Sequence, residues 1–261
     1  MPTSAPVTDL AGNYLYEVTS RLRQLAVNAQ SGAFDAAIDL MVTAINTGGV
    51  IQAFGTGHSE AFAMEIAGRA GGLIPTNKIA LRDVVLYGSR TVDLLGGSSL
   101  ERSPAIVDEL FEVTPVGPDD LFMIASNSGV NSCIVGLALL AKAKGHQLIA
   151  VTSMEHTMRV QPQHASGKRL CEVADVVLDN LAPYGDSTLR LGGPTSAGVT
   201  VGAVSSITAA FIAQLLTIGT ADRMASTGSQ PPMYISANIP GGDEHNHALE
   251  DLYRDKIRRS A

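Results

Sequence analysis

Apolar residues along the chain follow two different spacings, and their alternation predicts the order of helices and strands. In residues 10–30 and 34–46 they recur every three or four positions, as on one face of a helix. In residues 50–54 and 121–125 they form short continuous runs, which are typical of strands buried on both faces. Each run ends at glycine or serine and leads into a helical pattern, so we expect strand, tight loop and helix twice over.

Two further apolar runs, at residues 146–153 and 174–180, extend this order. The helical stretch 133–144 before them ends at Gly145, a common C-terminal stop. Residues 154–170 show no periodicity, and we expect a loop there. Strands that alternate with helices predict the α/β class, with a parallel sheet between two layers of helices. Ligands of such sheets bind at the carboxyl ends of the strands.

Composition narrows the class of protein. The 261 residues are 45% hydrophobic, which is ample for a buried core, and the net charge is −7. Lys and Arg form no run longer than Arg258-Arg259, so we expect no nucleic-acid partner. Cys133 and Cys171 lie far apart in apolar stretches, which favours reduced thiols. The first ten residues lack the pattern of a signal peptide, and we expect a cytoplasmic protein.

Residues 191–221 contain no charged side chain, which raises the alternative of a membrane span. Frequent Ser, Thr and Gly interrupt the apolar residues of this segment. We therefore expect no membrane partner and interpret the segment as a helix buried within the fold or at a subunit contact.

Two loops rich in glycine and hydroxyl groups follow the first two strands. Gly-Thr-Gly-His-Ser (55–59) lacks the third glycine of a dinucleotide fingerprint, and Ser-Asn-Ser-Gly-Val-Asn (126–131) has no place in one. Unpaired N–H groups at a helix start bind phosphate, so both loops predict a site for a phosphorylated small molecule. The candidate ligands are Gly57, His58, Ser59, Ser126, Asn127, Ser128, Gly129 and Asn131, with Thr152 and Ser153 after the next strand. The structural alternative is that Ser126 and Ser128 only cap a helix.

These loops, followed by Leu-Ile-Ala-Val-Thr-Ser (148–153), resemble the sugar isomerase (SIS) domain family, whose members bind phosphosugars. The stretches 57–72 and 231–253 resemble UPF0309, a group of bacterial SIS proteins. The resemblance implies a three-layer α/β/α fold with a five-stranded parallel sheet, flavodoxin-like or Rossmann-like in type. It also implies helices in 1–47 that pack on the domain and the dimer contact, an SIS domain in 48–261 with a C-terminal helix, and sites completed across the dimer.

Aldose–ketose interconversion needs a base that moves a proton between neighbouring carbons, and a carboxylate is a common choice. Glu65 is our first candidate because it lies less than two helical turns beyond the first loop. Glu65 to Arg69 also resembles the Glu-x-x-Gly-Arg of sedoheptulose 7-phosphate isomerases, which implies the role of base. Ser59 is four residues closer to this glutamate than in those enzymes. The alternative is an ion pair between Glu65 and Arg69 on a solvated face.

Other polar residues have competing interpretations. His58 is expected to bind phosphate, and Glu60 to stabilise the helix start. The tail 241–247 holds two carboxylates and two histidines; we expect no metal there, and His245 or Glu244 is a candidate second acid or base. Asp243 as a helix cap is the structural alternative. Arg102 and Ser187 are candidates for contacts to the sugar or phosphate, and a surface ion pair is as plausible for Arg102.

The function expected from these observations is a phosphosugar isomerase that uses carboxylates and no cofactor. An alternative is a lyase of the N-acetylmuramic acid 6-phosphate etherase type, in which the same base would eliminate a substituent. A third is a phosphosugar sensor without catalysis, as in SIS domains attached to regulators. The expected partners are a sugar phosphate and a second copy of the chain.

Overall fold

The computed structural model describes residues 7–96, 99–103, 105–192 and 198–259. At its centre is a five-stranded parallel sheet in the order β2-β1-β3-β4-β5, as in flavodoxin-like folds. The strands are β1 (Ile51–Gly55), β2 (Thr76–Ile79), β3 (Leu121–Ala125), β4 (Gln147–Thr152) and β5 (Val176–Asp179). Every residue of β1 and β3 is buried, which explains their continuous apolar sequences.

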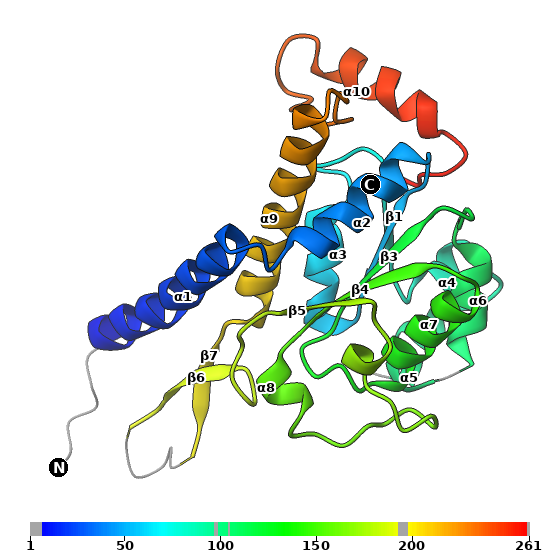
Figure 1. Cartoon of the computed structure of the whole chain (residues 1–261). Helices are drawn as coiled ribbons and strands as arrows, with labels where there is room; N and C mark the ends of the chain where they lie inside the picture. The colour runs from blue at the N-terminus through cyan, green and yellow to red at the C-terminus, as the bar shows by residue number, and fades with distance from the viewer. Residues whose placement is uncertain (1–6, 97–98, 104, 193–197, 260–261) are drawn as a thin grey trace.

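Helices cover both faces of the sheet and enclose two separate hydrophobic cores (Figure 1). On one face lie α2 (Asp35–Asn46), α3 (Glu60–Ile66) and α9 (Ser205–Ser226). On the other lie α4 (Asp83–Leu86), α5 (Ser99–Arg102), α6 (Ile106–Val113) and α7 (Ser132–Ala143). This arrangement confirms the three-layer fold that the sequence predicted.

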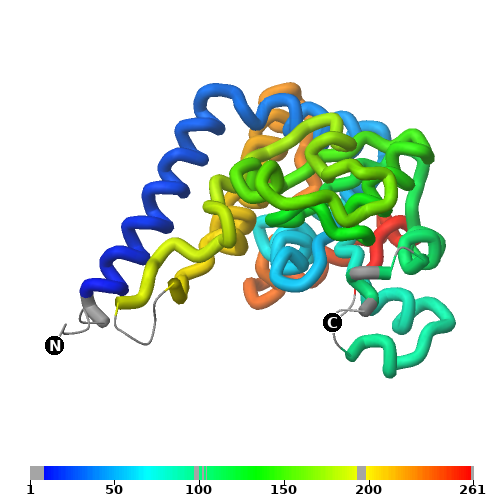
Figure 2. Tube along the Cα trace, turned by 90° about the horizontal axis from the view of Figure 1, so that it is seen from below, coloured from blue at the N-terminus to red at the C-terminus, as the bar shows by residue number. Residues whose placement is uncertain are grey.

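The first helix and a two-stranded hairpin project from this body (Figure 2). They are α1 (Val7–Gln30) and the antiparallel pair β6 (Ser187–Arg190) and β7 (Thr200–Ala203). The hydroxyl of Tyr14 donates to the carbonyl of Ala203 at 2.6 Å and so joins helix and hairpin. Leu15 and Tyr16 of α1 are exposed by 63% and 68%, an unusual degree for large apolar side chains.

The remaining elements are short. They are α8 (Met154–Thr157), α10 (Gly242–Glu250) and single 3-10 turns at Gly57–Ser59, Val92–Leu95, Leu170–Glu172 and Asp251–Tyr253. The predicted loop 154–170 therefore contains one helical turn, because the Ser153 hydroxyl accepts from the His156 amide at 3.0 Å and caps it.

The sequence analysis did not predict strand β2 because three of its four residues, Thr76, Asn77 and Lys78, are polar. Thr76 and Asn77 are nonetheless buried. The side chain of Asn77 donates to the carbonyl of Lys256 at 2.7 Å and accepts from the amide of Arg258 at 2.6 Å. The C-terminal segment thus lies against the edge strand and satisfies polar groups that an apolar pattern does not reveal.

The described residues of the uncharged segment lie in the hairpin and in α9. No helix among the described residues is long and apolar enough to cross a membrane. Helix α9 packs on α3, α2 and α1 but leaves Ile207 and Ile218 exposed by 39% and 62%. Within one chain it is therefore covered on one side only.

Candidate functional site

The two predicted loops meet at the point where the sheet changes its winding direction. Strands β1 and β3 are neighbours, with Gly55 opposite Ala125 at their carboxyl ends. The chain leaves β1 for α3 on one face and leaves β3 for α7 on the other. The loops therefore diverge and leave a crevice between them, which is the usual ligand site of doubly wound sheets.

The first loop turns back sharply onto α3. A Cβ atom on Gly55 would lie 2.3 Å from the Ser59 carbonyl oxygen, so only glycine fits there. Gly57 has φ +55° in the same turn. The hydroxyl of half-buried Ser59 forms no hydrogen bond with any described residue. The exposed His58 follows directly on Gly57, so an anion at this turn would meet both side chains and the first helical amides.

The second loop is held from behind by the segment that follows β4. Three of its carbonyl groups accept backbone hydrogen bonds of 2.8–3.2 Å: those of Asn127, Gly129 and Val130, from the amides of Ser153, Leu170 and Gln163. The amides of Ser128, Val130 and Asn131 have no acceptor among the described residues. Adjacent free amides form a concave anion-binding surface. The aperiodic segment 154–170 therefore has a structural role, since it orients this loop.

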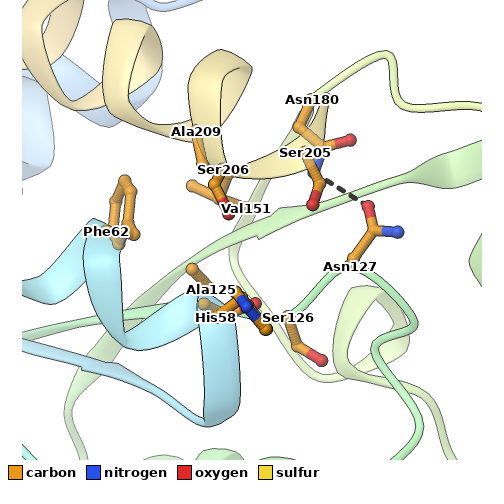
Figure 3. Close-up of a pocket in the computed structure, with 11 residues that line it drawn as sticks. His58, Phe62, Ala125, Ser126, Asn127, Val151, Asn180, Ser205, Ser206 and Ala209 are labelled. Atoms are coloured by element: carbon orange, nitrogen blue, oxygen red, sulfur yellow. Dashed lines mark hydrogen bonds between the residues drawn. The ribbon is translucent and has the colours of Figure 1, made fainter. Parts of the chain in front are cut away.

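Most polar side chains of this region form hydrogen bonds with other described residues, and that of Ser128 does not. Ser126 Oγ accepts from the Gly129 amide at 3.1 Å, and Asn127 Oδ1 accepts from Asn180 at 3.1 Å (Figure 3). The Thr152 hydroxyl faces the Asn127 carbonyl at 3.4 Å, and that of Ser153 donates to Ala182 at 2.6 Å. The Ser128 hydroxyl has no partner in the described part of the chain.

Gly129 is required by its surroundings. It has φ +63°, and a Cβ atom there would lie 2.8 Å from the Thr157 hydroxyl and 3.0 Å from that of Thr152. Both threonines are fully buried. The loop is therefore pressed against buried hydroxyl groups, which leaves no space for a side chain at this position.

A small pocket lies between the loops and the start of α9 (Figure 3). Its volume is about 10 Å³, enough for a single water. Ser205 and Ser206 reach it from α9, and the sequence analysis missed both because nothing local distinguishes them from other serines of the uncharged segment. The Ser205 hydroxyl and amide bind the carboxylate of Asp186 at 2.7 and 2.8 Å.

A larger cavity of about 320 Å³ opens on the other side of the first loop. This volume lies in the range of small-molecule sites. The residues that line it are Gly55, Thr56, Gly57, Glu60, Leu81, Arg82, Leu95, Leu100 and Glu101. Glu60 binds Arg82 with two hydrogen bonds of 2.6 and 3.0 Å, and this bonding raises the pKa of the Arg82 guanidinium. The cavity thus borders the first loop and two carboxylates, those of Glu60 and Glu101.

Glu65 lies on α3 but lines neither the small pocket nor this cavity. Its carboxylate pairs with Arg69, as the structural alternative predicted, and also accepts from the side-chain amide of Gln214 at 2.7 Å. Six residues separate it from Ser59, which is on the order of 9 Å along a helix.

Glu244 and His245 lie at the other end of the parallel strands, where the strands begin. His245 borders a cavity of about 670 Å³ together with Ile45 and Asn46, which precede β1. Its Nε2 atom lies 3.0 Å from the carbonyl of Met233, and Glu244 is exposed. Helix α9 spans roughly 33 Å between the two edges. One chain therefore does not bring these residues to the loops.

The last two predicted residues lie near the rim of the site. Ser187 begins β6, directly after the Asp186 that binds the start of α9. Arg102 ends α5, and its side chain falls outside the described part of the structure. No group of three or more His, Cys, Asp or Glu side chains in the described residues is arranged to hold a metal ion.

Comparisons with known proteins agree with this geometry. The SIS domain family matches residues 13–153. A UPF0309 protein of Listeria monocytogenes is 36% identical over 94% of this chain and 98% of its own. Among solved structures, a phosphoheptose isomerase from Francisella tularensis is similar with a TM-score of 0.53 at 16% identity, over 82% of this chain and 98% of its own. One from Neisseria gonorrhoeae has a TM-score of 0.51 at 18% identity, over 85% and 100%.

The structural likeness shows the shared fold, and the sequence relatives extend over nearly the whole chain. Both the crevice at the β1 and β3 ends and the two loops fall within the matched residues 13–153. The chain belongs to the SIS domain family and, within it, to the UPF0309 group.

Proposed function

We propose that this protein binds a sugar phosphate and interconverts its aldose and ketose forms. The observation that carries the proposal is the set of unpaired amides and hydroxyls of the two loops, which meet beside a cavity lined by carboxylates. The unpaired amides and hydroxyls fit a phosphate group, and the cavity fits a short polyhydroxyl chain. The names of the two similar isomerase structures support the same assignment.

In this proposal Ser59, Ser128 and the free loop amides hold the phosphate, and His58 closes over it. Glu65 removes the proton at C2 of the open-chain sugar and delivers it to C1. Arg69 and Gln214 fix the orientation of the carboxylate. The reaction is an internal exchange of hydrogen, so it needs no redox cofactor.

The test is turnover of a panel of aldose and ketose phosphates in D₂O, with analysis of products by NMR. Isomerisation should place deuterium at the exchanged carbon, and the unphosphorylated sugars should react far more slowly. Loss of a substituent at the carbon next to the exchanged one would instead identify the lyase alternative. Binding of a sugar phosphate without exchange or product would leave the sensor alternative and overturn the isomerase proposal.

We also propose that the protein acts as a dimer or higher oligomer, with residues 1–47 at the contact. The support is apolar surface: Leu15 on α1 and Ile218 on α9 are exposed by 63% and 62%. A second copy would cover this surface. Light scattering at micromolar concentration should report at least a dimer, and Leu15→Glu should shift it toward the monomer. A monomeric wild-type protein would contradict the proposal.

A further inference from the structure

Glu101 connects the two phosphate loops. Its Oε1 atom accepts a hydrogen bond of 2.8 Å from the hydroxyl of Thr56 in the first loop. The same atom accepts from the side-chain amide of Asn131 in the second loop. Thr56 and Asn131 are half-buried or buried, so these bonds are shielded from solvent. One carboxylate oxygen thus ties together the walls of the crevice.

The second oxygen of this carboxylate is uncommitted. No described residue donates a hydrogen bond to Oε2. No Lys, Arg or His side chain among the described residues lies within 4 Å of the Glu101 carboxylate. Glu60, the other carboxylate of the cavity, differs because Arg82 occupies both of its oxygens. Among the described residues, Glu101 is therefore the carboxylate lining this cavity that has an oxygen available to a sugar hydroxyl.

The surroundings of Glu101 include a helix terminus and a buried thiol. Glu101 lies beside the start of α7, where the helix dipole is positive. Glu101 also lies close to Cys133, the second residue of α7. Burial raises the pKa of the Cys133 thiol to about 12, and the negative charge of Glu101 is the next largest cause. The carboxylate is half-buried, so solvent screens it only in part.

Isomerisation needs a second proton carrier besides the base at carbon. When the C2 proton leaves, the C1 carbonyl becomes part of an enediol and its oxygen O1 gains a proton, while the O2 hydroxyl must lose one. His245 and Glu244 were the sequence-based candidates for this role, but in one chain they lie at the far edge of the sheet.

We propose that Glu101 performs this second transfer: its carboxylate takes the proton from O2 and returns a proton to O1, so that it ends in its starting state. The inference rests on the proposed function. It requires O1 and O2 of the sugar to lie within reach of both Glu101, at the wall of the 320 Å³ cavity, and Glu65, while the phosphate lies at the loops.

The informative variant is Glu101→Gln. A glutamine oxygen still accepts from Thr56 and Asn131, so the loops keep their bridge while the proton carrier is lost. We expect turnover to fall by about 10²- to 10⁴-fold, the usual yield of a positioned acid or base. Glu112→Gln, at an exposed position of α6, is the matched control and should react like the wild type. Glu101→Ala removes the bridge as well and should in addition raise KM.

A binding experiment judges Glu101 independently of turnover. Calorimetry should show that Glu101→Gln binds inorganic phosphate as tightly as the wild type does. Its affinity for a sugar phosphate should fall about tenfold, because a hydrogen bond from a hydroxyl to a charged oxygen is lost. If the wild type isomerises no sugar in the panel, the proposed function fails, and this comparison still decides whether Glu101 contacts the sugar. Unchanged sugar-phosphate affinity together with unchanged turnover in Glu101→Gln would overturn the inference.

Discussion

The central sheet has a carboxyl edge, where its parallel strands end, and an amino edge, where they begin. Both edges are rich in polar residues, yet they differ in what those residues are bonded to. At the carboxyl edge the amides of Ser128 and Asn131 and the hydroxyl of Ser59 have no partner among the described residues. At the amino edge, helix α10 carries six polar side chains, and three of them, those of His245, Asn246 and Glu250, are paired.

The pairing at the amino edge fixes the C-terminal part of the chain. Asn246 binds both backbone groups of Ile235, at 3.0 and 2.9 Å, and the hydroxyl of Tyr234 donates to Glu250 at 2.6 Å. Burial, followed by this bond to Glu250, raises the pKa of Tyr234 to about 12. Polar groups that satisfy one another build structure, whereas ordered groups left unpaired in a crevice are available to a ligand.

Among the variants that test this difference between the two edges, Glu65→Gln is expected to have the largest effect on turnover. The substitution keeps the shape and one hydrogen-bond acceptor but abolishes basicity, so turnover should fall by about 10²- to 10⁴-fold. Deuterium exchange at C2 of the substrate should disappear with it.

Glu109→Gln is the control for this variant because it also breaks a glutamate–arginine pair, with Arg90 on the surface. Chelators should leave the wild-type activity intact. Exchange at the wild-type rate in Glu65→Gln would show that the base lies elsewhere, and loss of activity on chelation would point to a metal.

A smaller effect is expected from Ser128→Ala. Its free hydroxyl would contact phosphate in both the ground state and the transition state, so KM should rise about tenfold while turnover changes little. Ser226→Ala, at the far end of α9, removes a serine hydroxyl bonded only to its own helix and serves as the control. Steady-state kinetics measures both, and an unphosphorylated sugar turned over equally well would argue against a phosphate site.

The smallest effect on turnover is expected at the amino edge. His245→Ala removes the contact to the Met233 carbonyl and should destabilise the protein by about 1 kcal/mol, a shift of about 2–4 °C in Tm. Turnover at a temperature where the variant is folded should stay within about threefold of the wild type. A loss of 10²-fold would mean that a second copy carries α10 to these loops, and mixing His245→Ala with Glu65→Gln should then restore activity.

The sequence by itself determined most of the elements that build the site. Continuous apolar runs marked the strands around residues 51–55 and 121–125 to within about one residue, because burial on both faces is a local property of the chain. Glycine and hydroxyl residues at the strand ends marked the two loops of the candidate site, since tight turns and helix starts have local chemical requirements. The SIS resemblance added the layer order, which the structure confirmed.

Only the tertiary structure decided which polar groups remain free. Glu65 and His245 are equally polar in the sequence, but packing places Glu65 against Gln214 of α9 and His245 against the carbonyl of Met233. Glu101 follows no recognisable motif and reaches Thr56 and Asn131 over 45 and 30 residues. Hydrogen bonds between residues so far apart depend on how the layers pack together, and local periodicity carries no record of them.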